Sequence, residues 1–232
     1  MFGLDHAIAG FSDGTTTAIV VVVAIALGFR HASDPDHLAA VSTLVATGKE
    51  RAARSAARLG LAWGAGHATS LFVLGLPVVL YSAYLPARVQ SWAETSVGFV
   101  IAALAVLLLT RWRRGAFRHA ADDHAVHEHA SARTRRQAYA IGVVHGMGGT
   151  AGVGLLLLAS IHSKLLAVVA LALFATFTAL SMAILSTGWG AALGSAPVRR
   201  SFDRVAPAIG GLTLLFGIWY ALGAQGLVSY AF

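Results

Sequence analysis

Residues 15–46 read TTTAIVVVVAIALGFRHASDPDHLAAVSTLVA, an apolar run that is interrupted by RHASDPDH at positions 30–37. As one straight helix its 32 residues would be about 48 Å long, which exceeds the roughly 30 Å hydrocarbon core of a bilayer. Pro35 removes a helical hydrogen bond and disfavours helical backbone at Asp34. Asp34 is therefore expected to cap a second half-helix that begins at Pro35. The stretch predicts one helix broken in its middle.

The composition indicates that this run belongs to a membrane protein. The chain has 232 residues, of which 57% are hydrophobic and 12% charged, and its mean hydropathy is +0.71. Soluble domains average about 45–50% apolar and about 25% charged residues, so a soluble enzyme is disfavoured. The net charge of +7 lies in short runs between apolar stretches, which favours a role in membrane topology over nucleic-acid binding. The absence of cysteine excludes thiolate metal sites.

Six apolar runs are bounded by charges and turn residues, and none alternates as a strand does. Backbone polar groups in lipid must be satisfied within their own segment, which favours helices. We therefore predict an all-α integral membrane protein with six transmembrane helices. These helices are expected at about 15–46, 59–81, 94–110, 138–160, 165–187 and 205–224. The chain is therefore expected to divide into two three-helix units, 1–110 and 138–232, which are joined by a His- and Arg-rich loop at 111–137.

Lysine and arginine gather in every second loop. They lie between the first and second runs, the third and fourth, and the fifth and sixth, while the alternate loops hold only Arg88 and Lys164. The positive-inside rule makes the three basic loops cytoplasmic and places both termini outside.

A short motif recurs in the two predicted units. Gly-x-x-His occurs at 28–31 and again at 142–145, an offset of 114 residues or about half the chain. The first and fourth runs cross in opposite directions by the charge rule. The motif therefore predicts a 3+3 inverted repeat of the kind found in transporters.

Ionisable side chains within apolar spans are rare and are functional by default. This chain has six of them, with Arg30 adjacent: His31, Asp34, Asp36, His37, His67 and His145. Imidazole and carboxylate without sulfur suit a divalent ion such as Ni²⁺, Co²⁺ or Zn²⁺, whereas Mg²⁺ or Ca²⁺ would want more oxygen. The set predicts a metal site, although a capped kink at the first motif and interhelical hydrogen bonds at His67 and His145 are the structural alternatives.

The loop at 111–137 contains a second group of histidines interleaved with acidic residues. His124, His127 and His129 give it a composition typical of weak metal collection. A merely solvated loop explains the same composition.

The first motif carries a family resemblance. RHASDPDHL at 30–38 resembles the RHAxDADHI signature of the nickel/cobalt transporter (NiCoT) family, and GHATSLF at 66–72 resembles its second motif. Pro35 replaces the usual alanine and Leu38 the usual isoleucine. The later acidic motif of the family is represented only by residues 148–152, which have no carboxylate. The six-span layout is most similar to the UreH-type nickel permeases of this group.

The resemblance implies a multi-pass carrier of the bacterial plasma (inner) membrane that takes up Ni²⁺ or Co²⁺ and has no resident cofactor. It implies ligation by His31, Asp36, His37 and His67, and supply of metal to an enzyme maturation system such as that of urease. Two alternatives stay open. One is an efflux carrier with the same site, since related exporters have His-rich loops. The other is a membrane acyltransferase that uses the His-x4-Asp spacing of His31 and Asp36 for a general base.

Overall fold

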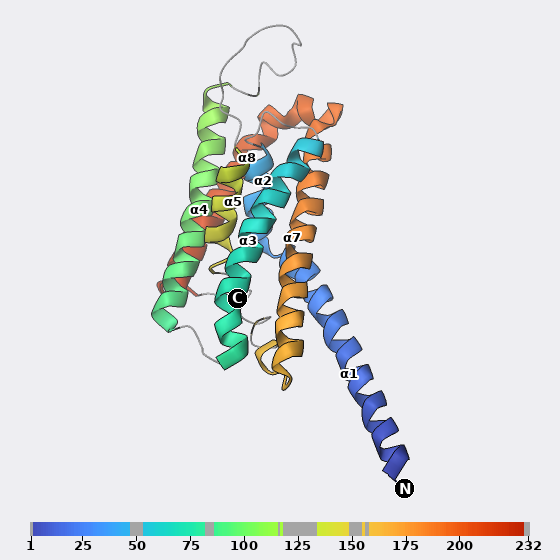
Figure 1. Cartoon of the computed structure of the whole chain (residues 1–232). Coiled ribbons are helices and arrows are strands. Elements are labelled where there is room, and N and C mark those ends of the chain that lie inside the picture. The colour runs from blue at the N-terminus through green and yellow to red at the C-terminus, as the bar shows by residue number, and fades with distance from the viewer. Residues whose placement is uncertain are drawn as a thin grey trace.

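The computed structural model describes residues 2–46, 53–81, 86–115, 117, 134–148, 155 and 158–229. Within these ranges every long element is an α-helix (Figure 1). In chain order the elements are α1 (Phe2–His31), α2 (Pro35–Ala46), α3 (Ala53–Tyr81), α4 (Ala87–Arg113), α5 (Arg135–His145), α7 (Lys164–Gly194) and α8 (Ala196–Ala224). The helical membrane class predicted from composition is confirmed.

The first apolar run is broken where the sequence predicts. Helix α1 ends at His31, α2 begins at Pro35, and the two are bent by 53°. Ser33 N–H donates to the Arg30 carbonyl at 2.9 Å, which closes a tight turn at the end of α1. The carbonyl of Phe29 accepts hydroxyl bonds from Ser33 and from Ser181 of α7, each at 3.3 Å. The backbone group released by the break is thus satisfied inside the protein, as membrane depth requires.

Four of the described helices are long and apolar enough to cross a bilayer, namely α3, α4, α7 and α8. The bent pair α1/α2 makes five if it is counted as one span. The predicted run at 138–160 begins in α5, whose 11 residues are too few to span alone, and most of residues 149–157 lie outside the described ranges. The count of six spans therefore stays a prediction. Helices α3 and α8 begin earlier than their apolar runs because a helix continues past the hydrocarbon into the headgroup region.

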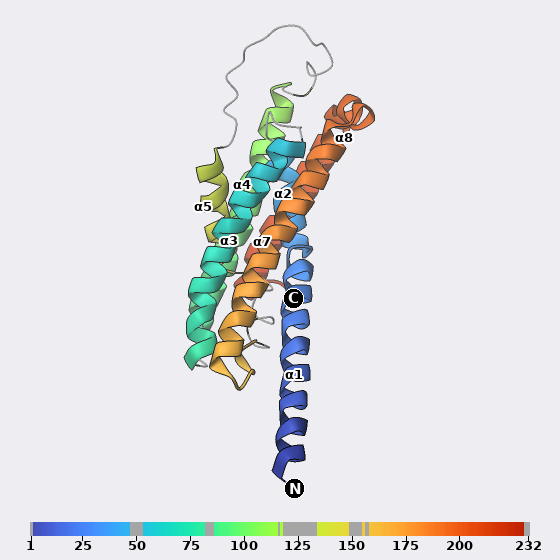
Figure 2. The same cartoon turned by 45° about the vertical axis from the view of Figure 1, so that its right-hand side comes forward.

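The two halves of the chain pack together rather than forming separate bodies. Helix α3 lies along α7 and α4 lies along α8, while α1 packs on α7 and α5 packs on α3 (Figures 1 and 2). Gly28 of α1 allows the closest approach to α7, because a Cβ there would lie 2.7 Å from the Phe174 carbonyl oxygen. Small residues at such crossings are the usual means of helix association in membranes.

Two apolar clusters fill the bundle, one on each side of the break. The basic-end cluster draws on six helices and extends from the side of the arginine-rich loops along α4 and α8 as far as Val97 and Tyr220; its members include Ala40, Leu44, Leu59, Trp63, Ile101, Leu108, Ala138, Met182 and Phe202. The far-end cluster draws on α1, α3, α7 and the segment before α7; its members include Ala24, Leu71, Val79, Leu158, Ala167, Leu171 and Phe174. The polar residues of the break lie between these clusters.

Candidate metal centre

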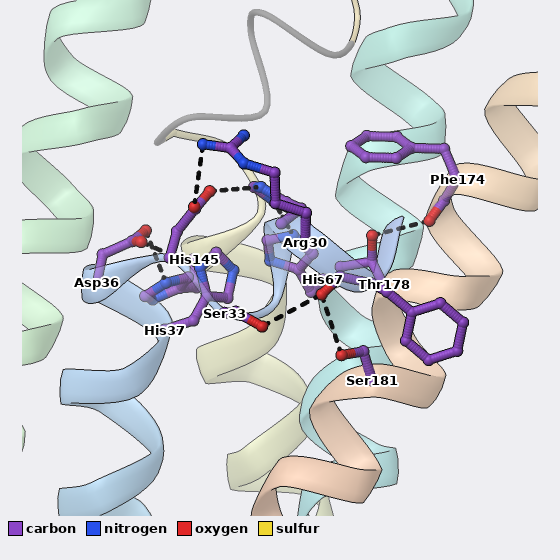
Figure 3. A network of polar contacts seen from close by, with 12 residues as sticks. Arg30, Ser33, Asp36, His37, His67, His145, Phe174, Thr178 and Ser181 are labelled. Carbon is purple, nitrogen blue, oxygen red and sulfur yellow. Dashed lines mark hydrogen bonds and ion pairs between the residues drawn. The ribbon is translucent and has the colours of Figure 1, made fainter. Parts of the chain in front are cut away.

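Three imidazoles meet beside the break, each from a different helix. His31 ends α1, His37 lies in the first turn of α2, and His67 lies in the middle of α3. Their candidate ligand atoms lie within 4.8 Å of one another, and Nε2 of His31 is 3.0 Å from Nε2 of His67. Two nitrogens that each lie about 2.1 Å from a metal ion, with a right angle between the two metal–nitrogen bonds, are about 3.0 Å apart. This outer triad, His31, His37 and His67, therefore has spacing that suits a metal ion. Figure 3 labels two of its members, His37 and His67.

A second triad shares His37 with the first. It consists of Asp36, His37 and His145, with candidate ligand atoms again within 4.8 Å of one another. His37 Nδ1 and Asp36 Oδ1 form a 3.0 Å hydrogen bond. The other carboxylate oxygen of Asp36 is 3.3 Å from His145 Nε2, a contact that lacks hydrogen-bond geometry. This inner triad joins the first half of the chain to the second through one carboxylate.

All of these side chains are deeply buried, and several of their polar atoms have no hydrogen-bond partner. The four histidines are at most 4% exposed and Asp36 is 2% exposed. The unpartnered atoms among the described residues include His37 Nε2, His67 Nδ1 and His145 Nδ1. An unpaired buried polar group costs about 1–3 kcal/mol, so this group of donors is unfavourable as a structural element. Coordination of a cation would satisfy such nitrogens.

Asp34, the remaining predicted residue, belongs to neither triad. Its carboxylate lies 3.4 Å from His31 Nδ1 and 3.9 Å from the guanidinium of Arg30. The Arg30 side chain is 72% exposed, so this ion pair connects the buried imidazoles to the surface of the bundle. In this position the Asp34 carboxylate faces His31, an arrangement that is common for carboxylates beside metal-binding histidines.

Close helix contact brings His67 and His145 together. A Cβ on Gly66 would collide with the Tyr139 carbonyl of α5, and a Cβ on Gly142 would collide with the Trp63 carbonyl of α3. The two helices therefore touch backbone to backbone, and the rings of His67 and His145 lie 6.0 Å apart. The glycines of both motifs have a packing role that a census of ionisable residues does not capture.

Trp63 is a residue of the centre that the sequence reasoning missed. Its ring centroid lies 5.9 Å from that of His37 and 5.6 Å from that of His145. It is 1% exposed, and its Nε1 has no hydrogen-bond partner among the described residues. The sequence held a signal for it, because Trp63 precedes His67 by four residues and so shares its helix face. The loop histidines His124, His127 and His129 lie outside the described residues.

The chain has a relative along most of its length. It is 27% identical over 207 residues to the urease accessory protein UreH of Bacillus sp. (strain TB-90), an alignment that covers 87% of this chain and 90% of that protein. That name describes an accessory protein, which agrees with the expectation of a carrier rather than an enzyme. No family model matches the chain, and no solved structure matches it. The similarity agrees with the resemblance that the motifs at 30–38 and 66–72 carry, and the chain is similar to UreH along most of its length.

Proposed function

We propose that this protein is a membrane carrier that takes up Ni²⁺, with Co²⁺ as a second substrate, through the two triads beside the broken helix. The observation that carries the proposal is the meeting of four buried imidazoles and one buried carboxylate from four helices. Such groups are costly at membrane depth and are retained for ion pathways. Nitrogen and oxygen ligands without sulfur suit Ni²⁺ and Co²⁺.

The ligands in this proposal are Asp36, His37, His67 and His145, with His31 completing the outer triad and Asp34 orienting it. The charge of Asp36 offsets part of the cost of removing a divalent cation from water. His37 belongs to both triads, so an ion moving between them keeps one ligand throughout. Asp36 bonds His37 and faces His145, and Asp34 faces His31, so the carboxylates hold imidazoles and give no specific support to an acyltransferase.

The helix packing supports a 3+3 inverted repeat as the basis of alternating access. Helices α1 and α5 each end at the histidine of Gly-x-x-His. Exchange of the two halves replaces α1 by α5 and α7 by α3, and both pairs, α1 with α7 and α5 with α3, are packed together. In this proposal the basic loops are cytoplasmic, the termini are outside, and the membrane is the bacterial inner membrane, where imported nickel serves urease maturation.

Metal accumulation in cells tests the proposal. Expression of the native chain should raise cell nickel, and the His37→Ala variant should lose at least about 99% of that increase, since even an orienting residue changes metal affinity by about 10–100-fold. His162→Ala is the matched control, because His162 is exposed and belongs to neither triad. Lower cell nickel with higher nickel tolerance would instead identify an exporter, and unchanged accumulation in His37→Ala would contradict the site.

A further inference from the structure

The metal centre lies between two aromatic rings that mark its two ends. Trp63 of the basic-end cluster contacts His37 and His145, two members of the inner triad. Phe174 of the far-end cluster contacts His31 of the outer triad, with ring centroids 5.6 Å apart. Trp63 therefore covers the inner triad through His37 and His145, and Phe174 covers the outer triad through His31.

The two coverings are unequal. Six helices supply the basic-end cluster that backs Trp63, whereas α1, α3, α7 and the segment before α7 supply the far-end cluster. On the outer side a polar connection also reaches the surface, from His31 through Asp34 to the exposed Arg30. No such polar connection appears on the Trp63 side among the described residues. The Trp63 side of the centre is therefore the side that is backed by the larger cluster.

Along α3, Trp63 lies between His67 of the metal centre and the basic loop that precedes this helix. Trp63, His67 and Ser70 lie on one helix face, four and three residues apart. Ala56 and Leu59 of the same helix belong to the basic-end cluster, which continues from Trp63 toward the loop. An ion leaving the inner triad in that direction meets the indole first.

We infer that the indole of Trp63 is the inner gate of the carrier, the side chain that seals the metal centre from the cytoplasm and must move before the ion is released. This inference rests on the proposed function for its substrate and on the basic loops being cytoplasmic. The buried Nε1–H without a partner favours such movement, because the group gains a hydrogen bond when the ring reaches water.

The absence of cysteine from the chain permits a direct test with a single reporter thiol. Ser70→Cys places the thiol one turn beyond His67, on the opposite side from Trp63. Inside-out vesicles containing the full chain are treated with a small cationic methanethiosulfonate, which reaches only the cytoplasmic face. With Trp63 in place the thiol should react slowly. Trp63→Ala should raise the labelling rate at least about tenfold, whereas Trp63→Phe, which keeps an apolar ring, should stay within about twofold.

Phe202→Ala is the matched control, because Phe202 is a buried ring of the same cluster that packs on Phe117 instead of on an imidazole. It should leave the labelling rate within about twofold. Equal acceleration by Phe202→Ala or by Trp63→Phe, or no acceleration by Trp63→Ala, would overturn the gate. So would acceleration from the outer face alone. Trp63→Leu, expected to react at least about threefold faster than Trp63→Phe, decides the matter if the alanine variant does not fold.

The readout separates this inference from the proposed function. Thiol labelling requires no metal, while calorimetric titration of the purified native chain with NiCl₂ reports binding alone. If the native chain does not bind Ni²⁺ but labelling is accelerated in Trp63→Ala, the transport proposal is overturned while the role of Trp63 in closing the centre is supported. Normal Ni²⁺ binding without accelerated labelling would overturn the gate alone.

Discussion

The ends of α1 and α5 share a motif but differ in the residues that come after it. Each helix ends at the histidine of Gly-x-x-His, His31 in one case and His145 in the other. After His31 come two aspartates, a proline and a second histidine, and the chain turns into α2. After His145 the sequence to residue 152 is rich in glycine and has no carboxylate.

One half of the chain therefore supplies the charge of the centre, and close packing between glycines of both halves brings the remaining ligand to it. Asp36 comes from the first break, yet its second oxygen faces His145 of the other half. The glycines of α3 and α5 allow the backbones to touch, which brings His145 within reach. Asp36 is thus a buried carboxylate that is shared between the two halves of the chain.

Asp36→Asn removes the shared charge at nearly constant volume and should have the largest effect. Without the carboxylate, the desolvation of a divalent cation is no longer offset, and we expect Ni²⁺ affinity to fall at least about 100-fold, beyond the 10–100-fold typical of an outer residue. Titration calorimetry on the purified protein measures this. Asp203→Asn, in α8 and outside both triads, should bind as the native chain does. Native affinity in Asp36→Asn would show that the charge is structural.

His145→Ala tests whether the second half contributes a ligand. The outer triad stays complete in this variant, so Ni²⁺ affinity should fall by about 10–100-fold and transport should be reduced rather than lost. The same titration, with nickel accumulation in cells, measures both quantities. An unchanged affinity would restrict the second half to packing and would leave the centre to the first half alone.

Gly66→Ala tests the close packing of α3 against α5 without changing any of the proposed ligands. Its Cβ would meet the backbone of α5, so the helices must separate, at a cost of about 1–3 kcal/mol in the free energy of unfolding. Because His67 and His145 then move apart, Ni²⁺ affinity should fall several-fold. Gly188→Ala is the control, since a Cβ there meets nothing within 4 Å and alanine favours the helix. Equal thermal unfolding temperatures for the two variants would show that close packing is dispensable.

Much of this arrangement could be predicted from the sequence because its causes are local. Apolar runs, Pro35 and the charged loops act within one segment, so the helical class and the break at His31 follow from them. The helix ends were less accurate, since hydropathy marks the hydrocarbon region and α3 begins at Ala53, ahead of its apolar run. The residues that could form a site were found because ionisable groups are rare in apolar spans.

The pairing of these residues could not be predicted, because it depends on how the helices cross. The search for ionisable residues within apolar spans finds both Asp34 and Asp36, but Asp34 faces Arg30 and His31 while Asp36 lies between His37 and His145. Trp63 carries no charge and so escaped the census. Its place against two imidazoles follows from the contact of α3 with α5, which only the three-dimensional structure reveals.

X-ray absorption at the nickel edge, measured on purified protein loaded with Ni²⁺, tests the central claim most directly. The account predicts a shell of nitrogen and oxygen with at least three imidazole ligands and no sulfur, and a loss of imidazole scattering in the His37→Ala variant. A shell of oxygen alone, as for hydrated nickel, or a sulfur ligand would contradict the centre described by the two triads.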